Sequence, residues 1–376
     1  MFSEDIAHAE GPSAYAQAAE LEVRHVSKRY PGQREPAIGD LSFTVPAGEV
    51  CVLVGPSGSG KTTTMRMINR MIALTGGDIL LGGRSVLERN PRELRREIGY
   101  VIQQIGLFPH RTIEENIATV PELLGWPKQR IAARVAELWD LIGLSREELS
   151  GRYPAQLSGG QRQRVGVARA IAADPPLLLM DEPFGAIDPI NRSRLQDEFL
   201  RLQQQVRRTV VFVTHDIDEA IKVGDRIAIL REGGVLAQYD TPGEILRAPA
   251  DDFVAQFVGA DRGIKRLSLI TLDELDLLDA DGPGAPDAQP GGPAAQPVSV
   301  HTTARDALSL LLSSRALYLS VVDDDGSRRG LLTVELLHRT LASDGHGRGA
   351  RGSRPEPGQA AAAGAAEQRA VRSESR

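Results

Sequence analysis

One glycine-rich stretch constrains the fold of this chain more than any other feature. It consists of Gly55, Pro56, Ser57, Gly58, Ser59, Gly60, Lys61, Thr62 and Thr63. An apolar run precedes it and a helix-forming segment follows, which is the strand, loop and helix order of a P-loop. Such glycines let consecutive N–H groups turn toward an anion at the start of a helix. Lys61 can then reach the β- and γ-phosphates, and the Thr62 hydroxyl can ligate Mg²⁺. The stretch therefore predicts binding of a nucleoside triphosphate, and its context disfavours a chance glycine-rich turn.

Length and composition restrict the class of protein. A chain of 376 residues is long enough for two domains and a full α/β core. The chain has 41% hydrophobic and 25% charged residues, an ordinary composition for a soluble protein. Its net charge of -6 gives no reason to expect nucleic acid as a partner. Cys51 is the only cysteine, which fits a reducing compartment. No apolar run approaches the roughly 18 residues of a membrane span, and residues 1–5 do not resemble a signal peptide. Any role at a membrane is therefore expected to be that of a peripheral subunit.

Two apolar runs end in side chains suited to phosphate chemistry. The run 177–180 is followed by Asp181 and Glu182, and the run 210–214 by His215. Continuous apolar runs are typical of central parallel strands, and ligands bind at the carboxyl ends of such strands. Asp181 is placed to hold Mg²⁺ through water, and Glu182 to act as general base on the attacking water. The strand-helix-strand interval predicts that His215 lies beside the same phosphate.

Three further positions carry weaker signals. Tyr30 could stack on adenine, or it could pack on the sheet. Gln103 is one of the two amides that end the predicted strand 98–104, where an amide can contact Mg²⁺ or orient a water. A second anion-binding helix start is formed by Ser158, Gly159, Gly160 and Gln161, without a lysine of its own. One nucleotide rarely needs two such sites, which indicates a site shared between two copies; the alternative is an ordinary glycine-rich helix start.

The motifs resemble, in their order, those of ABC transporter ATPase subunits. They are Tyr30, the P-loop, Gln103, residues 157–161, Asp181 with Glu182, residues 185–188 and His215. The resemblance covers residues 20–262 and implies a site for ATP and Mg²⁺. In this site Tyr30 would stack on adenine, and Gln103 and Asp181 would bind the metal. Glu182 would be the catalytic base and His215 the switch histidine. It also implies a head-to-tail homodimer, in which Ser158, Gly159 and Gly160 of one copy close on the γ-phosphate held by the other. Ile187 stands where the family usually has leucine, and it leaves Asp188 in place.

A narrower resemblance concerns the transported solute. Residues 98–110 and 266–270 are similar to the osmoprotectant importers for glycine betaine, carnitine and choline. This implies an ATP-hydrolysing subunit at the cytoplasmic face of the inner membrane, with integral membrane permease subunits and a separate solute-binding protein as partners. The chain is only 4% aromatic, whereas binding of a quaternary ammonium generally needs an aromatic cage, so the partners are expected to recognise the solute. Two alternatives stay open: an importer ATPase for another solute such as an amino acid, and a soluble non-transport ABC ATPase.

The expected fold class is α/β: a P-loop ABC ATPase domain with a mixed sheet and a helical subdomain, plus a small, incomplete CBS-like α+β domain. A helical insertion is predicted over 112–149, broken at Pro121 and Pro127. The predicted segments are a poorly ordered N-terminus, 1–19; the ATPase domain, 20–262; a linker with a CBS-like remnant, 263–297; one CBS-like repeat of strand-helix-strand-strand-helix order, 298–341; and a disordered tail, 342–376. Since CBS repeats commonly pair, the repeat is expected to meet its counterpart in a second copy and tune transport; the alternative is a decayed remnant.

Overall fold

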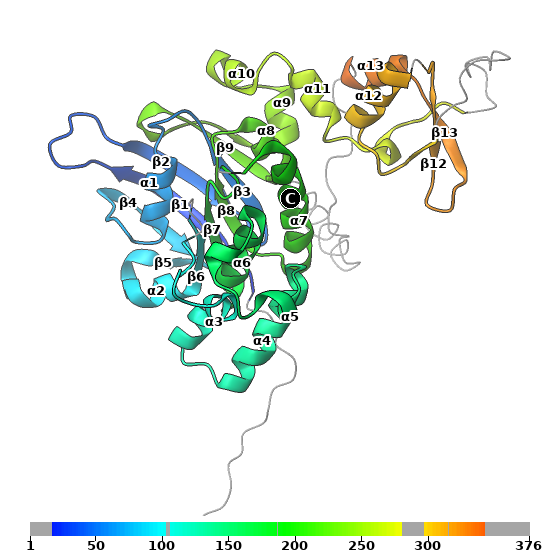
Figure 1. Cartoon of the computed structure of the whole chain (residues 1–376). Helices are drawn as coiled ribbons and strands as arrows, with labels where there is room; N and C mark the ends of the chain where they lie inside the picture. The colour runs from blue at the N-terminus through cyan, green and yellow to red at the C-terminus, as the bar shows by residue number, and fades with distance from the viewer. Residues whose placement is uncertain (1–16, 103–105, 186, 280–296, 315, 343–376) are drawn as a thin grey trace, which may run out of the picture.

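A six-stranded sheet forms the centre of the molecule (Figure 1). The structure is a computed structural model, and it describes residues 17–102, 106–185, 187–279, 297–314 and 316–342. The strand order is β10-β9-β3-β8-β7-β6, and all neighbours are parallel except β10 and β9. The strands are β3 (Val50–Val54), β6 (Ile98–Val101), β7 (Leu177–Asp181), β8 (Thr209–Val213), β9 (Arg226–Arg231) and β10 (Val235–Asp240).

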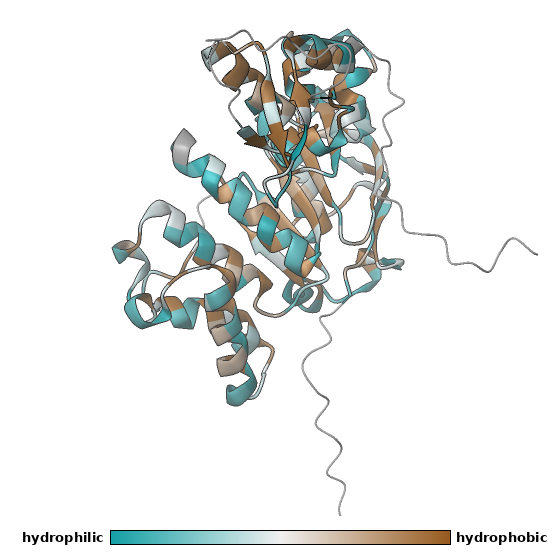
Figure 2. Ribbon diagram, turned by 90° about the vertical axis from the view of Figure 1, so that its right-hand side faces the viewer, coloured by the Kyte–Doolittle hydropathy of each residue, from teal (hydrophilic) through white to brown (hydrophobic). Residues whose placement is uncertain are grey.

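Both faces of this sheet are buried. In β3 all five residues are buried, and alternate residues belong to two different hydrophobic clusters. Val50, Val52 and Val54 pack on one side, while Cys51 and Leu53 pack on the other. A strand that is covered on both faces needs a continuous apolar run, and the hydrophobic colour of the central strands shows this directly (Figure 2). The predicted central parallel strands are confirmed.

An antiparallel sheet and two helices cover one face. The sheet has the order β2-β1-β4-β5. Its elements and the two helices are β1 (Leu21–Lys28), β2 (Ile38–Val45), β4 (Gly76–Leu81), β5 (Arg84–Ser85), α1 (Lys61–Ile68) and α2 (Pro91–Glu97). Residues of α1 and of this sheet share one hydrophobic cluster with Cys51 and Leu53. The helix after the glycine loop is therefore enclosed between two sheets, which fixes the loop in place.

Helices cover the opposite face. They are α3 (Ile113–Leu123), α4 (Lys128–Leu141), α5 (Arg146–Leu149), α6 (Gly159–Ile171), α7 (Pro189–Val206) and α8 (Ile217–Val223). The expected helical insertion corresponds to α3–α5, with Pro127 at the N-cap of α4. The predicted break at Pro121 is wrong, because this residue lies inside α3. It lies in the last turn, where a missing N–H removes one hydrogen bond, and the Leu124 N–H still donates to the Val120 carbonyl at 3.0 Å.

A small second unit follows three short helices, α9 (Pro242–Arg247), α10 (Asp252–Val258) and α11 (Arg262–Leu267). Its elements are β11 (Pro297–Ser299), α12 (Ala304–Ser314), β12 (Leu319–Val322), β13 (Arg328–Leu332) and α13 (Val334–Ala342). Their order is the one predicted for a CBS-like repeat, and the sheet order is β11-β12-β13. Leu267 and Leu272 share its hydrophobic core, and Leu278 bridges to Leu331. The predicted remnant therefore completes the core of this unit.

Several predicted segments fall outside the described residues: most of the N-terminal stretch, residues 280–296 of the linker, and the tail from 343 onward. Within the part of the chain that the structure describes, no helix combines the length and apolar composition needed to cross a membrane.

The buried aromatic cluster behind the central sheet provides a first prediction. Phe212 is 0% exposed, and its ring centroid lies 5.8 Å from that of Phe184 and 6.0 Å from that of Phe199. Phe212→Ala is expected to lower the free energy of unfolding by about 3–5 kcal/mol, because it leaves a cavity among rigid neighbours. Urea denaturation measures this, with Leu123→Ala as control since Leu123 is 61% exposed. Equal losses in the two variants would contradict the packing described.

Candidate functional site

The glycine loop lies at the carboxyl end of β3 and leads directly into α1. Gly60 has φ 84° and precedes the first helical residue, Lys61. A Cβ at Gly55 would overlap the carbonyl oxygen of Leu230, so only glycine fits there. The Lys61 Nζ donates to the carbonyl oxygens of Gly55 at 2.8 Å and Pro56 at 2.9 Å. Lys61 is thus held over the loop, where its ammonium group can donate to phosphate oxygens in place of these carbonyls. Burial lowers its pKa, while the charges of Glu182 and Asp181 oppose that shift.

The predicted metal-binding side chains of α1 and β7 meet. The Thr62 hydroxyl donates to the Asp181 Oδ1 at 3.3 Å. Asp181 is 8% exposed, and this burial raises the pKa of its carboxyl, an effect that the Thr62 hydrogen bond opposes. A hydroxyl and a carboxylate in contact at a phosphate loop are the donors that Mg²⁺ uses in nucleotide sites. These two residues therefore fit the predicted ion.

The predicted base and histidine also lie together. Glu182 follows β7 with φ 45°, and its N–H donates to the Val213 carbonyl at 2.9 Å, which holds the ends of β7 and β8 together. The His215 Nδ1 lies 3.3 Å from the Glu182 Oε1. A cavity of about 510 Å³ joins both side chains to the glycine loop, and it is lined by Ala37, Ser57, Gly58, Gly60, Lys61, Thr62, Thr63, Glu182 and His215. This volume suits a ligand with several phosphates.

Tyr30 does not line this cavity, whose described lining residues come from elsewhere in the chain. Tyr30 is half-buried, and the Lys28 Nζ lies 4.9 Å from the centre of its ring. Gln103 lies outside the described residues. Ala37, in the loop between β1 and β2, does line the cavity, and its carbonyl oxygen lies close to Gly60. Nothing in the sequence marks Ala37, since an alanine carries no reactive side chain.

The second glycine motif lies elsewhere on the molecule. Ser158 is the N-cap of α6: its hydroxyl accepts from the Gln161 N–H at 3.2 Å, and the Gln161 Oε1 accepts from the Ser158 N–H at 2.9 Å. Asp188 caps α7 in the same way, accepting from the Asn191 N–H at 3.1 Å. Ser158, Gly159 and Asp188 are exposed, Gly160 is half-buried, and none of them lines the cavity of the glycine loop. Within one chain the predicted site residues therefore form two separate groups.

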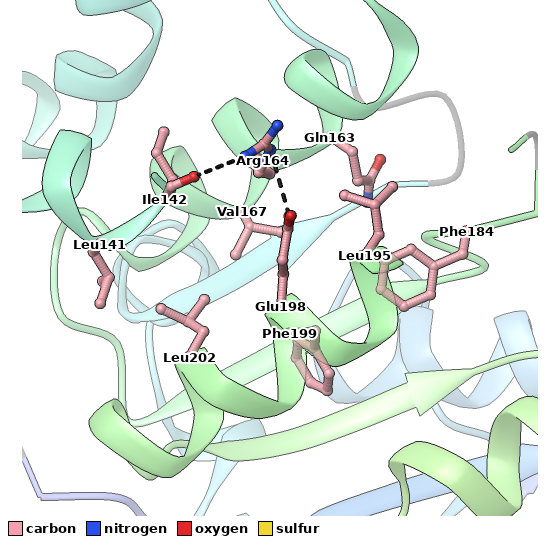
Figure 3. Close-up of a pocket in the computed structure, with 10 residues that line it drawn as sticks. All are labelled: Leu141, Ile142, Gln163, Arg164, Val167, Phe184, Leu195, Glu198, Phe199 and Leu202. Atoms are coloured by element: carbon pink, nitrogen blue, oxygen red, sulfur yellow. Dashed lines mark hydrogen bonds and ion pairs between the residues drawn. The ribbon is translucent and has the colours of Figure 1, made fainter. Parts of the chain in front are cut away.

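An ion pair connects the two helices that begin at Ser158 and Asp188. The Arg164 Nε of α6 lies 3.5 Å from the Glu198 Oε2 of α7, and the Arg164 Nη1 donates to the Ile142 carbonyl after α4 at 3.3 Å (Figure 3). A mostly apolar cavity of about 40 Å³ lies at this junction, lined by Leu141, Ile142, Gln163, Arg164, Val167, Phe184, Leu195, Glu198, Phe199 and Leu202. Arg164 thus ties α4, α6 and α7 together, which keeps the exposed ends at Ser158 and Asp188 in a fixed relation.

A buried carboxyl behind His215 predicts a pH effect on stability. Glu219 is 5% exposed and accepts from the Gln196 Nε2 at 2.9 Å. Burial raises its pKa above the usual 4.5, so its contribution to stability is greatest at acidic pH and is lost as the pH rises above 4.5. Glu219→Gln removes this titration. Urea denaturation should therefore show the free energy of unfolding of the variant rising relative to that of the unmodified chain as the pH increases above 4.5. A difference that does not change with pH would contradict the burial.

The sequence of this chain is similar to those of known proteins. A family model described as ABC transporter matches residues 38–185. The choline transport ATP-binding protein OpuBA of Bacillus subtilis is 46% identical over 319 residues, which cover 84% of this chain and 79% of that protein. The chain belongs to the ABC transporter family. It is one of the family's transport ATPases, with the P-loop fold and the ATP-binding function that the motif order predicts.

Two further comparisons extend this result. The osmoprotectant import ATP-binding protein OsmV of Salmonella typhimurium is 52% identical to this ABC transporter ATPase over 258 residues, covering 68% of the chain and 67% of that protein. A solved dimeric structure, the post-hydrolysis state of the ATP-binding cassette MJ0796 bound to ADP and Pi, is 31% identical with a TM-score of 0.52. The match covers 59% of this chain and 98% of that one.

Proposed function

We propose that this ABC transporter ATPase energises the import of an osmoprotectant quaternary amine such as glycine betaine, carnitine or choline. The observation that carries the proposal is the extent of the similarity to OpuBA. The aligned 319 residues exceed the length of the predicted ATPase domain, so the similarity includes part of the second unit. OsmV, named for osmoprotectant import, supports the same solute class.

The proposed ATP site uses the residues that converge on the 510 Å³ cavity. Loop N–H groups and Lys61 bind the phosphates, and Glu182 takes the proton of the attacking water as general base. His215, 3.3 Å from Glu182, keeps that carboxylate oriented and can contact the terminal phosphate. Mg²⁺ bound with ATP would be held by Thr62, Asp181 and Gln103 and would offset the phosphate charge. We also propose that Tyr30 stacks on the adenine of ATP. The bounds proposed for the two domains are 20–262 and 298–341.

We also propose that two copies complete each site. Ser158, Gly159 and Asp188 are exposed and, with Gly160, lie outside their own chain's cavity, which leaves them available to a second copy. The dimeric cassette MJ0796 supports this arrangement. Closure of the dimer around ATP would then act on permease subunits at the cytoplasmic face of the inner membrane, while a separate binding protein presents the solute.

Uptake by the host organism tests the solute class. Deleting the gene should abolish accumulation of labelled glycine betaine, carnitine or choline after an osmotic upshift, and the unmodified gene should restore it. Labelled amino acids, taken up unchanged, serve as the control. Loss of amino-acid uptake alone would instead favour the alternative importer, and no change in any solute would favour a soluble ABC ATPase.

A further inference from the structure

One buried lysine connects the ATP site to the second unit. The connection begins at Asp216, which directly follows His215 and is the N-cap of α8. Its Oδ1 accepts from the Asp218 N–H at 2.9 Å and from the Glu219 N–H at 3.3 Å. Because these hydrogen bonds attach Asp216 to the first turn of α8, a shift of α8 would also move the backbone of the adjacent His215.

The connection continues through Lys265 of α11. This residue is 8% exposed, and its Nζ donates to the Val258 carbonyl at 2.8 Å. The same Nζ lies 3.0 Å from the Asp218 Oδ1 of α8 and 3.2 Å from the Asp261 Oδ1. Burial alone would lower the pKa of Lys265, but hydrogen bonds with Asp218 and Asp261 outweigh it and the pKa lies above its usual value. Lys265 is therefore charged, and its ion pair joins α8 to α11.

The next two residues of α11 contact the second unit. The Arg266 Nη1 donates to the Leu341 carbonyl of α13 at 3.4 Å, and Leu267 is 1% exposed in the hydrophobic core that includes Leu311. Helix α11 lies between α9 and the pair α12 and α13, contacting all three (Figure 1). Three consecutive side chains of one helix thus contact the ATPase domain on one side and the second unit on the other.

We propose that Lys265 is a positioning residue through which the second unit holds α8, and with it His215, against Glu182. The inference rests on the proposed function, because it takes His215 to act in ATP hydrolysis. Lys265 touches neither the cavity nor the glycine loop residues that line it. A change in the second unit should accordingly alter kcat for ATP hydrolysis and leave the KM for ATP nearly unchanged.

A double-mutant cycle on the full chain tests this coupling. Leu311→Ala loosens the core of the second unit, and Lys265→Met removes the ion pair while keeping the apolar stem. Each single substitution is expected to lower kcat by about 2- to 30-fold, the usual range for coupling between distant sites. In the Lys265→Met background, Leu311→Ala should lower kcat by less than about 2-fold further, because the ion pair that links the second unit to α8 is already absent. Lys265→Arg should recover part of the activity.

The matched control is Lys222→Met. Lys222 also lies on α8, but its Nζ pairs with Asp197 of α7 at 2.8 Å, away from the second unit. In that background Leu311→Ala should keep its full effect. If Leu311→Ala acts equally in the unmodified and Lys265→Met chains, or leaves kcat unchanged in the unmodified chain, the proposal is wrong. Leu311→Val replaces Leu311→Ala if the latter does not fold.

Hydrogen exchange separates failure of this inference from failure of the proposed function. Both Leu311→Ala and Lys265→Met should speed hydrogen exchange of the amides of residues 216–223. In the Lys222→Met control background, Leu311→Ala should still speed exchange of these amides. Unchanged exchange in Leu311→Ala would overturn the coupling even in an active enzyme. Absence of ATP hydrolysis by the unmodified chain would instead count against the proposed function, while the exchange data would still decide on the link.

Discussion

Replacing Glu182 by glutamine is expected to lower ATP turnover by about 10²–10⁴-fold while ATP binding persists, the usual scale for loss of a general base. The amide has nearly the same shape as the carboxylate but cannot accept the proton of the attacking water. Glu182 lies on the wall of the cavity, and its Oε1 is 3.3 Å from the His215 Nδ1, so the contacts of the phosphate loop stay intact in the variant. Steady-state phosphate release and binding of a fluorescent ATP analogue measure the two effects.

Lys61→Ala is the contrasting variant. The Lys61 ammonium is held at the loop by the Gly55 and Pro56 carbonyls and is proposed to bind the phosphates themselves. Its loss should weaken ATP binding rather than turnover of bound ATP. Near-normal hydrolysis in Glu182→Gln would exclude this residue as the base, and unchanged affinity in Lys61→Ala would exclude the phosphate contact.

Ser158→Arg is expected to abolish ATP-dependent dimerisation of the Glu182→Gln protein, in which ATP is not consumed. Ser158 is exposed at the N-terminus of α6, outside the cavity of its own chain. The arginine would add bulk where the partner's γ-phosphate is proposed to lie, yet it leaves the chain's own phosphate loop unchanged. Analytical ultracentrifugation with and without ATP measures the dimer, and a binding titration at low protein concentration measures the affinity of the monomer.

Ser158→Ala is the matched control. It removes the same N-cap hydrogen bond, at a cost of about 1 kcal/mol in stability, but adds no bulk. It should therefore impair the dimer much less than arginine does. A collapse of monomer affinity for ATP in Ser158→Arg would place the site within one chain and refute the shared arrangement.

Those parts of the fold that depend on local pattern are predictable from the sequence. The runs that become β3, β7 and β8 are apolar without interruption because both faces of their sheet are buried. Glu182 and His215 meet for a simple reason: they follow the neighbouring parallel strands β7 and β8, whose carboxyl ends share one edge, and Asp181 is the last residue of β7. The capping of α6 by Ser158 likewise follows from its residue type.

Features that depend on tertiary contacts are not predictable in this way. Pro121 looks like a helix break, yet one missing hydrogen bond in a last turn is outweighed by the packing of α3. Ala37 lines the cavity through its place in a loop and has no sequence signal. The ion pair between Lys265 and Asp218 joins residues 47 positions apart, and each taken alone looks like an ordinary surface charge.

Solute accumulation in reconstituted vesicles tests the central claim most directly. Vesicles would contain this chain with the permease subunits and binding protein that co-purify with it, ATP and Mg²⁺ on the side of this chain, and labelled glycine betaine, carnitine or choline on the other. We expect one of these solutes to accumulate against its gradient with ATP, and no accumulation with a non-hydrolysable analogue or with Glu182→Gln. Equal accumulation by the unmodified and Glu182→Gln proteins, or none of any quaternary amine with active ATPase, would contradict the account.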